Sequence, residues 1–413
     1  MIAGAASRRA RAGLGVTLVL CTCCGKVGDI ADRASLDRRF DQYVRLVLAL
    51  GARDPDSLDF YAGPAAWAQR ARTDPPTIPE IRAAALALDG EVMREQPRHS
   101  AERSRRLFLM GQLQALAARA QLLEGRRLPF DDESRLLFGV DAGNRDKSVF
   151  TQARREIDAL LPGRGALSER YSAFDRRFLV APSHLPAVMA AAIDGCRRVT
   201  AAHLTLPPGE QVRVEYVRGM PWSAFTRYEG HARSLTQINL DFALTVDRLL
   251  ELACHETYPG HHVINGLLDM PVQPMFSPQS LRTEGAATFA VELAFPEADR
   301  LAFERDRLFP LAGLDTHDAE LYQRVSRLVD RLRWLQVDVA RRYLDGELEF
   351  VRAATALEED ALMPAPDATL KFFNEFRTYA VTYTVGRDLA ANFVAARDDL
   401  RQKWRAYEEW IRP

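Results

Sequence analysis

Apolar residues recur at helical spacing along almost the whole chain after residue 30, and this periodicity constrains the fold more than any other feature of the sequence. No repeat of fixed period interrupts it, and no linker divides it. We therefore expect a mostly α protein, with one large helical domain over residues 31–413. The periodic stretches that predict helices are 36–50, 78–93, 107–123, 182–202, 243–258, 281–292, 318–344, 348–361 and 373–410, the last with breaks.

Two short segments depart from the helical pattern. Residues 211–217 and 234–240 alternate apolar and polar side chains with a period of two, which is typical of β-strands. Glycine and proline punctuate the segment between them. We predict a small sheet of two or three strands at about 211–241, followed directly by helices over about 243–292.

Composition places the chain among ordinary globular proteins. Of its 413 residues, 47% are hydrophobic and 27% are charged, which excludes a disordered chain, a collagen-like fibre and a multi-pass membrane protein. The 55 basic and 56 acidic residues leave a net charge of −1, so the sequence indicates no nucleic-acid partner. It contains neither a glycine-rich phosphate loop nor a Gly-x-Ser-x-Gly nucleophile elbow.

The first 30 residues have the pattern of an export signal. Arginines at 8, 9 and 11 precede an apolar stretch at 12–20, and cysteines follow at 21, 23 and 24. The cysteines resemble a bacterial lipobox, with Cys23 as the lipidated residue. We expect a periplasmic protein or a membrane-anchored lipoprotein; the alternative is a cytoplasmic protein with a mispredicted start codon. Cys196 and Cys254 remain after cleavage; one disulfide between them is possible, but we expect both to be small buried hydrophobic residues.

Three of the eight histidines fall within the eight residues His255-Glu-Thr-Tyr-Pro-Gly-His-His262. Imidazole is the commonest protein ligand for transition metals, zinc above all. In zinc hydrolases a glutamate directly after the first histidine is the general base and not a ligand. The cluster therefore predicts a Zn²⁺ site with Glu256 as the catalytic base; manganese or cobalt suits the same ligand types.

The spacing within this cluster requires a break in the helix. A regular helix would place His262 about 10.5 Å along its axis from His255, too far to share one ion. A bulge at Pro259–Gly260 would instead bring His261 to the second ligand position. The shorter form His-Glu-x-Gly-His of some helical zinc carboxypeptidases also has a glycine before its second histidine. We favour His261 as the ligand, with His262 behind it or against substrate.

Glu284 is the candidate third ligand, 23 residues after His261. It opens a stretch of small residues, which would let its helix pack closely against the helix of His255. Three protein ligands would leave a fourth position open for water, as catalysis requires. The alternatives are a closed metal site, no metal, or a Glu284 that is simply a solvated residue at a helix N-terminus.

At these residues the sequence resembles the bacterial domain of unknown function 885 family. His255–His262 matches its His-Glu-x-x-Pro-Gly-His-His pattern, and Glu284-Gly-Ala-Ala corresponds to its Glu-Gly-Trp-Ala, without the tryptophan. Residues 377–386 resemble its C-terminal feature of a tyrosine and a glycine. The resemblance runs from about residue 33 and implies a mostly helical, zincin-like fold, export and metallopeptidase activity.

A zinc peptidase needs a hydrogen-bond donor for the oxyanion besides the metal. Tyr383 is our first candidate, with Tyr379 and Arg377 behind it. We expect the strand at 234–240 to be an edge strand that pairs with an extended peptide. A terminal carboxylate of the substrate would suit an arginine, and the candidates are Arg227, Arg233, Arg282 and Arg377.

Two other functions remain open at the level of sequence. One is hydrolysis of a non-peptide amide or ester by the same metal site. The other is a catalytically degenerate envelope lipoprotein or binding module, which the missing tryptophan after Gly285 favours. The expected partner is in each enzymatic case a peptide or small amide substrate, and the sequence indicates no protein partner.

Overall fold

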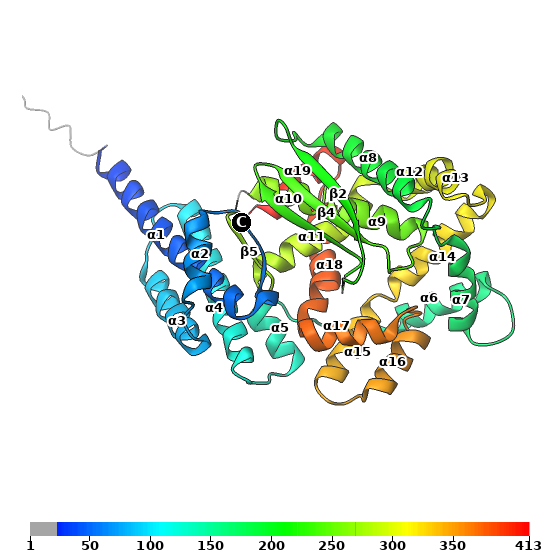
Figure 1. Cartoon of the computed structure of the whole chain (residues 1–413), viewed down its shortest axis with the longest axis horizontal. Coiled ribbons are helices and arrows are strands. Elements are labelled where there is room, and N and C mark those ends of the chain that lie inside the picture. The colour runs from blue at the N-terminus through cyan, green and yellow to red at the C-terminus, as the bar shows by residue number, and fades with distance from the viewer. Residues whose placement is uncertain (1–22, 221, 269, 413) are drawn as a thin grey trace, which may run out of the picture.

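The computed structural model describes residues 23–220, 222–268 and 270–412 and is mostly helical, which confirms the predicted fold class. Helices α1–α5 form one end of the molecule (blue to cyan in Figure 1). Apolar residues of α1, α3 and α4 pack into a core of their own there. The elements of this region are α1 (Cys23–Arg53), η1 (Pro55–Ser57), β1 (Leu58–Tyr61), α2 (Ala65–Thr73), α3 (Ile78–Arg94), α4 (Ser100–Leu123) and α5 (Phe130–Phe138).

The predicted sheet is present and has three strands, β2 (Gln211–Val217), β3 (Ala224–Gly230) and β4 (Arg233–Asn239). Their order is β2-β4-β3, with β2 parallel and β3 antiparallel to β4. The prediction that residues 234–240 form an edge strand is therefore wrong, because β4 pairs on both sides. The edges belong to β2 and β3, and β3 is the edge that contacts the central helices.

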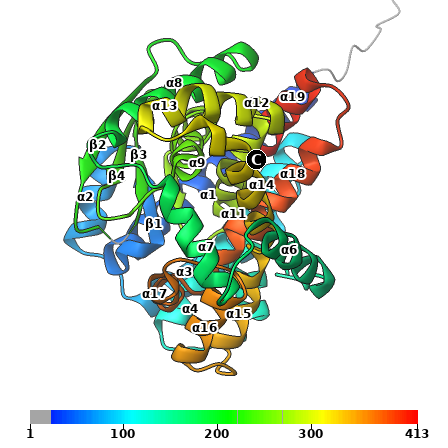
Figure 2. The same cartoon turned by 90° about the vertical axis from the view of Figure 1, so that its right-hand side faces the viewer.

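The central helices lie beside this sheet; one of them precedes it in the chain and three follow it (Figures 1 and 2). They are α8 (Leu185–His203), α9 (Val246–Glu256), α10 (His261–Leu268) and α11 (Pro278–Ala294). A short strand, β5 (Val272–Pro274), joins α10 to α11 and pairs with β1 of the N-terminal region. Most of α11 is buried, since its small residues let neighbouring segments approach on every side.

The remaining helices surround this centre, and both views place α15–α17 together on one side (Figures 1 and 2). Residues 318–344, predicted as one helix, form two, because the chain breaks after Arg331. These elements are α6 (Lys147–Leu160), α7 (Leu167–Asp175), η2 (Arg176–Phe178), α12 (Glu297–Phe303), η3 (Glu304–Leu308), α13 (Phe309–Ala312), η4 (Thr316–Asp318), α14 (Ala319–Arg331), α15 (Trp334–Leu344), α16 (Phe350–Glu359), α17 (Pro366–Phe376), η5 (Arg377–Tyr379), η6 (Thr382–Gly386), α18 (Arg387–Ala395) and α19 (Leu400–Ile411).

Cys196 and Cys254 form a disulfide bond, so the less favoured of the two possibilities is the one present, and the expectation of two separate buried residues is wrong. Cys196 of α8 and Cys254 of α9 are fully buried and their Cα atoms lie 5.6 Å apart. With 58 residues between them, the sequence alone gave no reason to prefer the pairing. The bond ties α9 to α8 at the residue before His255.

The predicted export signal lies mostly outside the described residues. Helix α1 begins at Cys23 and continues to Arg53, so the boundary expected near residue 30 falls inside a helix. None of the described helices combines the length and apolar character needed to span a bilayer.

Two glycines bring α11 and η6 into direct backbone contact. A Cβ atom on Gly285 would stand 2.3 Å from the backbone of Gly386, and one on Gly386 would stand 2.6 Å from the carbonyl oxygen of Leu281. Real side chains do not tolerate such distances, so both positions require glycine. The contact places the segment of Tyr383 beside the helix of Glu284.

We predict that Gly285→Ala lowers the free energy of unfolding by about 2 kcal/mol or more, because the new methyl group meets fixed backbone. Gly266→Ala in α10 is the matched control, since a Cβ atom there meets nothing within 4 Å. This control should gain about 0.5–1 kcal/mol from its lower unfolded-state entropy. Urea unfolding of the two variants measures both values, and equal stabilities would contradict the contact.

Candidate metal centre

A tight corner separates the two helices that carry the clustered histidines. Helix α9 ends at Glu256 and α10 begins at His261, with a cis peptide bond between Tyr258 and Pro259 in the corner. The amide of Gly260 donates to the carbonyl of Cys254 at 3.0 Å. A Cβ atom on Gly260 would stand 1.9 Å from the carbonyl oxygen of His255. The predicted bulge within one helix is thus a full break between two helices.

The corner brings three predicted ligands to one point. His255 Nε2 and His261 Nε2 are 3.1 Å apart, while Glu284 Oε1 lies 3.2 Å from His261 Nε2 and Glu284 Oε2 lies 3.6 Å from His255 Nε2. Ligands bound tetrahedrally at about 2.1 Å from one zinc ion are about 3.4 Å apart. The observed separations match that geometry.

The cluster remains accessible and contains unsatisfied oxygen atoms. The side chains of His255, His261 and Glu284 are 17%, 13% and 12% exposed. Within the described part of the chain, Glu284 Oε2 and Glu256 Oε2 are buried without a hydrogen-bond partner. Buried carboxylate oxygens are normally hydrogen-bonded. An oxygen without a partner at this position fits a site that binds a cation or a water molecule. The residues present therefore fit a zinc ion with an open position.

The charges of the three groups are strongly coupled. Burial, together with the neighbouring His261, lowers the pKa of His255 to about 3. Burial also disfavours the charged form of His261, but Glu284 outweighs it and raises that pKa to about 9. Burial opposes ionisation of Glu284 as well, yet His261 holds its pKa below the usual value. Without a metal ion, one proton therefore resides on His261 and offsets the Glu284 charge.

Glu256 is buried where α9 contacts strand β3. The residue is 5% exposed, and the nearby hydroxyl of Thr226 on β3 acts on its pKa; Thr226 also bonds Thr236 of β4 at 2.7 Å. Burial raises the pKa of Glu256, against the attraction of His261. A carboxyl group whose pKa is raised is a suitable proton acceptor and donor near neutral pH.

The two predicted tyrosines occupy different places. Tyr383 of η6 lies against the cluster, its ring 6.3 Å from that of His255. Within the described residues its hydroxyl group has no hydrogen bond. Tyr379 lies near Glu284 and helps to keep the pKa of that carboxyl low, and its hydroxyl is 3.2 Å from Ser280 Oγ. Tyr383 is thus placed to reach a ligand, whereas Tyr379 favours the ionised form of Glu284.

His262 lies outside the cluster. Its Nδ1 is 2.8 Å from Ser234 Oγ on β4 and its Nε2 is 3.1 Å from Glu210 Oε2. Glu210 is also held by Arg197 and Tyr258. This buried network joins α10 to the sheet and leaves His262 with no free nitrogen for a metal.

Three of the four arginines expected to hold a substrate carboxylate have other partners, and the fourth, Arg233, is exposed at the start of β4. Arg377 Nε donates at 2.7 Å to Glu133, which is fully buried. Arg282 donates to the carbonyl oxygens of Trp410 and Arg412 at the end of α19. Arg227 lies beside Glu229 on the exposed face of β3. The arginine whose charge acts on the pKa values of His255, Glu256 and Tyr383 is instead Arg248. It lies two turns before His255 on α9.

Buried polar contacts fix the positions of the corner and of α11. The hydroxyl group of Tyr407 on α19 donates to the carbonyls of Pro259 and Ala286, each at 3.2 Å. Ser277 caps the start of α11 by accepting from the amide of Ser280. Glu284 therefore lies in the second turn of α11, which corrects the expectation that it opens the helix.

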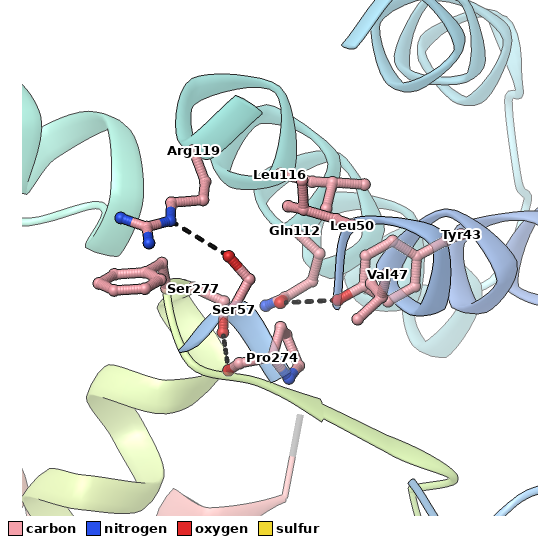
Figure 3. A pocket seen from close by; sticks show the side chains of 10 residues that line it. Tyr43, Val47, Leu50, Ser57, Gln112, Leu116, Arg119, Pro274 and Ser277 are labelled. Atoms are coloured by element: carbon pink, nitrogen blue, oxygen red, sulfur yellow. Dashed lines mark hydrogen bonds between the residues drawn. The ribbon is translucent and has the colours of Figure 1, made fainter. Parts of the chain in front are cut away.

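One group near the cluster was missed by sequence analysis. Asp59 of β1 is partly buried, and burial raises its pKa to about 7, with Glu284 and Glu256 adding to the rise and His261 opposing it. A lone aspartate in a short strand some 200 residues before the motif has no signal that one sequence can reveal. The same segment borders a cavity of about 10 Å³, room for one water molecule at most (Figure 3).

Comparisons with known proteins add little at this point. No family model matches the sequence, and neither does any curated protein. A solved structure described as a "putative lipoprotein" from Colwellia psychrerythraea has 14% identity and a TM-score of 0.45, over 80% of this chain and 66% of that one. A second, of the same description and of unknown function, from Shewanella oneidensis has 13% identity and a TM-score of 0.41, over 83% and 74%. This chain spans just under two thirds of the first, and at such values the likeness carries no argument.

We predict that His262→Ala destabilises the protein by about 2–3 kcal/mol, because Glu210 and Ser234 lose their buried partner. His317→Ala is the control, since His317 is exposed and should change stability by less than about 0.5 kcal/mol. Thermal unfolding measures both. A His262→Ala protein as stable as the control would show that the network contributes little.

Proposed function

We propose that this protein is a zinc-dependent hydrolase, and specifically a metallopeptidase, with His255, His261 and Glu284 as the metal ligands. The convergence of these three side chains at tetrahedral separations, beside a glutamate with an unpartnered oxygen, carries the proposal. Their partial exposure favours a catalytic site over a closed structural one. Manganese or cobalt would suit the same ligands.

Each residue then has a separate task in amide hydrolysis. Zinc supplies a Lewis acid at this site, which acidifies water and polarises a carbonyl group. Glu256 takes a proton from the water as its oxygen bonds the carbonyl carbon, and returns that proton to the amine as the carbon–nitrogen bond breaks. Tyr383 donates a hydrogen bond to the developing oxyanion. Tyr379 favours the ionised form of Glu284.

An edge strand beside Glu256 favours a peptide over a small amide or ester. Strand β3 pairs only with β4 within the described sheet, and it contacts α9, the helix that ends at Glu256. An extended peptide would add to this edge through main-chain hydrogen bonds, which tolerate many sequences. In this proposal the strand that pairs with the peptide is therefore residues 224–230, in place of residues 234–240.

The disulfide supports an exported site of action, since such bonds persist in oxidising compartments. A periplasmic enzyme or a lipoprotein anchored at Cys23 both meet this condition. The competing function is a catalytically degenerate envelope lipoprotein or binding module. A protein with that function would have the same location but would not turn over substrate. The two experiments that follow therefore distinguish the two functions.

We predict that about one zinc ion binds per chain and that saturating zinc raises the melting temperature, because the ion binds only the folded state. His261→Ala should abolish both effects, whereas His317→Ala, an exposed control, should keep them. Elemental analysis and thermal unfolding with and without zinc give the two readouts. Loss of zinc from His262→Ala in place of His261→Ala would transfer the ligand role to His262.

We predict that Glu256→Gln lowers turnover of a quenched peptide library by about 10²–10⁴-fold while zinc content is unchanged, because the amide cannot accept the proton. Glu320→Gln, an exposed control with the same change in charge, should retain full activity. Unchanged turnover in Glu256→Gln would remove its assignment as base. A zinc-loaded wild-type protein that cleaves no peptide, amide or ester would favour the binding module.

A further inference from the structure

Strand β2 leaves one of its two edges unpaired. It pairs only with β4 and is the outermost strand of the sheet, whereas the other edge strand, β3, lies on the side of β1 (Figure 2). No residue of β2 is buried, and Arg213, Glu215 and Tyr216 are exposed. The strand is therefore accessible along its whole length.

The free main-chain groups of this edge belong to alternate residues. The amide of Gln211 donates to the carbonyl of Ala232 at 3.0 Å, and the carbonyl of Val217 accepts from the amide of Leu240 at 2.9 Å. The odd-numbered residues of β2 therefore direct their amide and carbonyl groups toward β4. The even-numbered residues direct theirs away from the sheet, where no described segment bonds them; these are Val212, Val214 and Tyr216.

Strand β2 lacks most of the features that keep an open edge from pairing. Natural edge strands are commonly short, bulged, interrupted by proline or covered by another segment. The seven residues of β2 stay in unbroken register with β4 and include no proline. By contrast, β3 has a register shift between Tyr228 and Gly230. The charges on β2 are Arg213 and Glu215, and they have opposite signs, so the edge can accept a partner strand with complementary charges.

The positions of these two charges favour a second copy of β2 as that partner. Two identical antiparallel strands related by a twofold axis pair around one central residue, and directly opposite side chains lie on the same face. A centre at residue 213 or 215 would place like charges opposite each other, which destabilises a sheet. A centre at Val214 places Arg213 of each copy opposite Glu215 of the other.

The same centre also uses the free main-chain groups. With Val214 at the twofold axis, Val212 of each copy lies opposite Tyr216 of the other, so every residue with outward groups enters a hydrogen-bonded pair. Val214 is the middle residue of the strand, so the pairing extends over its full length. These three side chains share one face, where contacts between aromatic and β-branched residues stabilise paired strands. Charge, hydrogen bonding and length therefore agree on one register.

We propose that two copies of this protein associate through β2, antiparallel and centred on Val214, and so join their two sheets into one. This inference is independent of the proposed catalytic function. The strand order β2-β4-β3 places both copies of β3 at the outer ends of the joined sheet, away from the interface. The edges proposed to receive a peptide therefore stay free, and each candidate metal centre lies within one chain.

Sedimentation equilibrium of the full-length protein at increasing concentration tests the dimer. The wild-type protein should reach a mass about twice that of one chain. Glu215→Arg and Arg213→Glu each place like charges opposite each other, so each should weaken self-association by about tenfold or more. Glu320→Arg, at an exposed glutamate of α14, is the control and should leave the dimer unchanged. Both altered β2 side chains are exposed, so the variants should fold, which circular dichroism checks.

An equimolar mixture of Glu215→Arg and Arg213→Glu provides the sharpest result. In a mixed pair both cross-strand contacts join opposite charges again, so the mixture should dimerise within about threefold of the wild-type affinity although neither variant does so alone. Three results would overturn the inference: a wild-type protein that stays monomeric, a dimer that survives in either single variant, or a mixture that stays monomeric. The first would leave the edge to an extended segment of another protein, and the second would place the contact on another surface.

Discussion

The whole site depends on the absence of a side chain at Gly260. The backbone folds back on the end of α9 so closely that any Cβ atom would overlap the carbonyl of His255. This approach ends one helix and starts the next within four residues. Two histidines six positions apart can therefore present their Nε2 atoms to one point. The disulfide behind Cys254 and the hydroxyl group of Tyr407 keep the two sides of the corner in place.

A second close approach supplies the remaining groups. Gly285 and Gly386 let α11 and η6 touch through their backbones, and the flanking residues Glu284 and Tyr383 then reach the cluster from two segments about a hundred positions apart. Tyr407 links this arrangement to the corner, because it donates to Pro259 and Ala286 together. Backbone packing thus brings the ligands, the base and the hydroxyl donor together.

The electrostatics of the site oppose stability and favour a ligand. Burial raises the pKa of Glu256 and of Asp59, and both lie near the ionised Glu284. A proton shared between His261 and Glu284 offsets part of this cost in the metal-free protein. A cation bound there would take over that role and displace the proton, so metal affinity falls as the pH falls. Such a site lowers the free energy of unfolding of the metal-free protein and at the same time favours binding of a cation.

The helical class follows from the sequence alone, because apolar residues repeat at a helical period over most of its length. The sequence also indicated the strands at 211–217 and 234–240 and the residues His255, Glu256, His261 and Glu284, since chemistry restricts which types stand at such spacings. Packing fixed what the sequence left open: β4 is central, Cys196 meets Cys254, and Arg377 pairs with Glu133. Those are contacts between distant segments, and they depend on how whole elements pack, which leaves no periodic or local mark in the sequence.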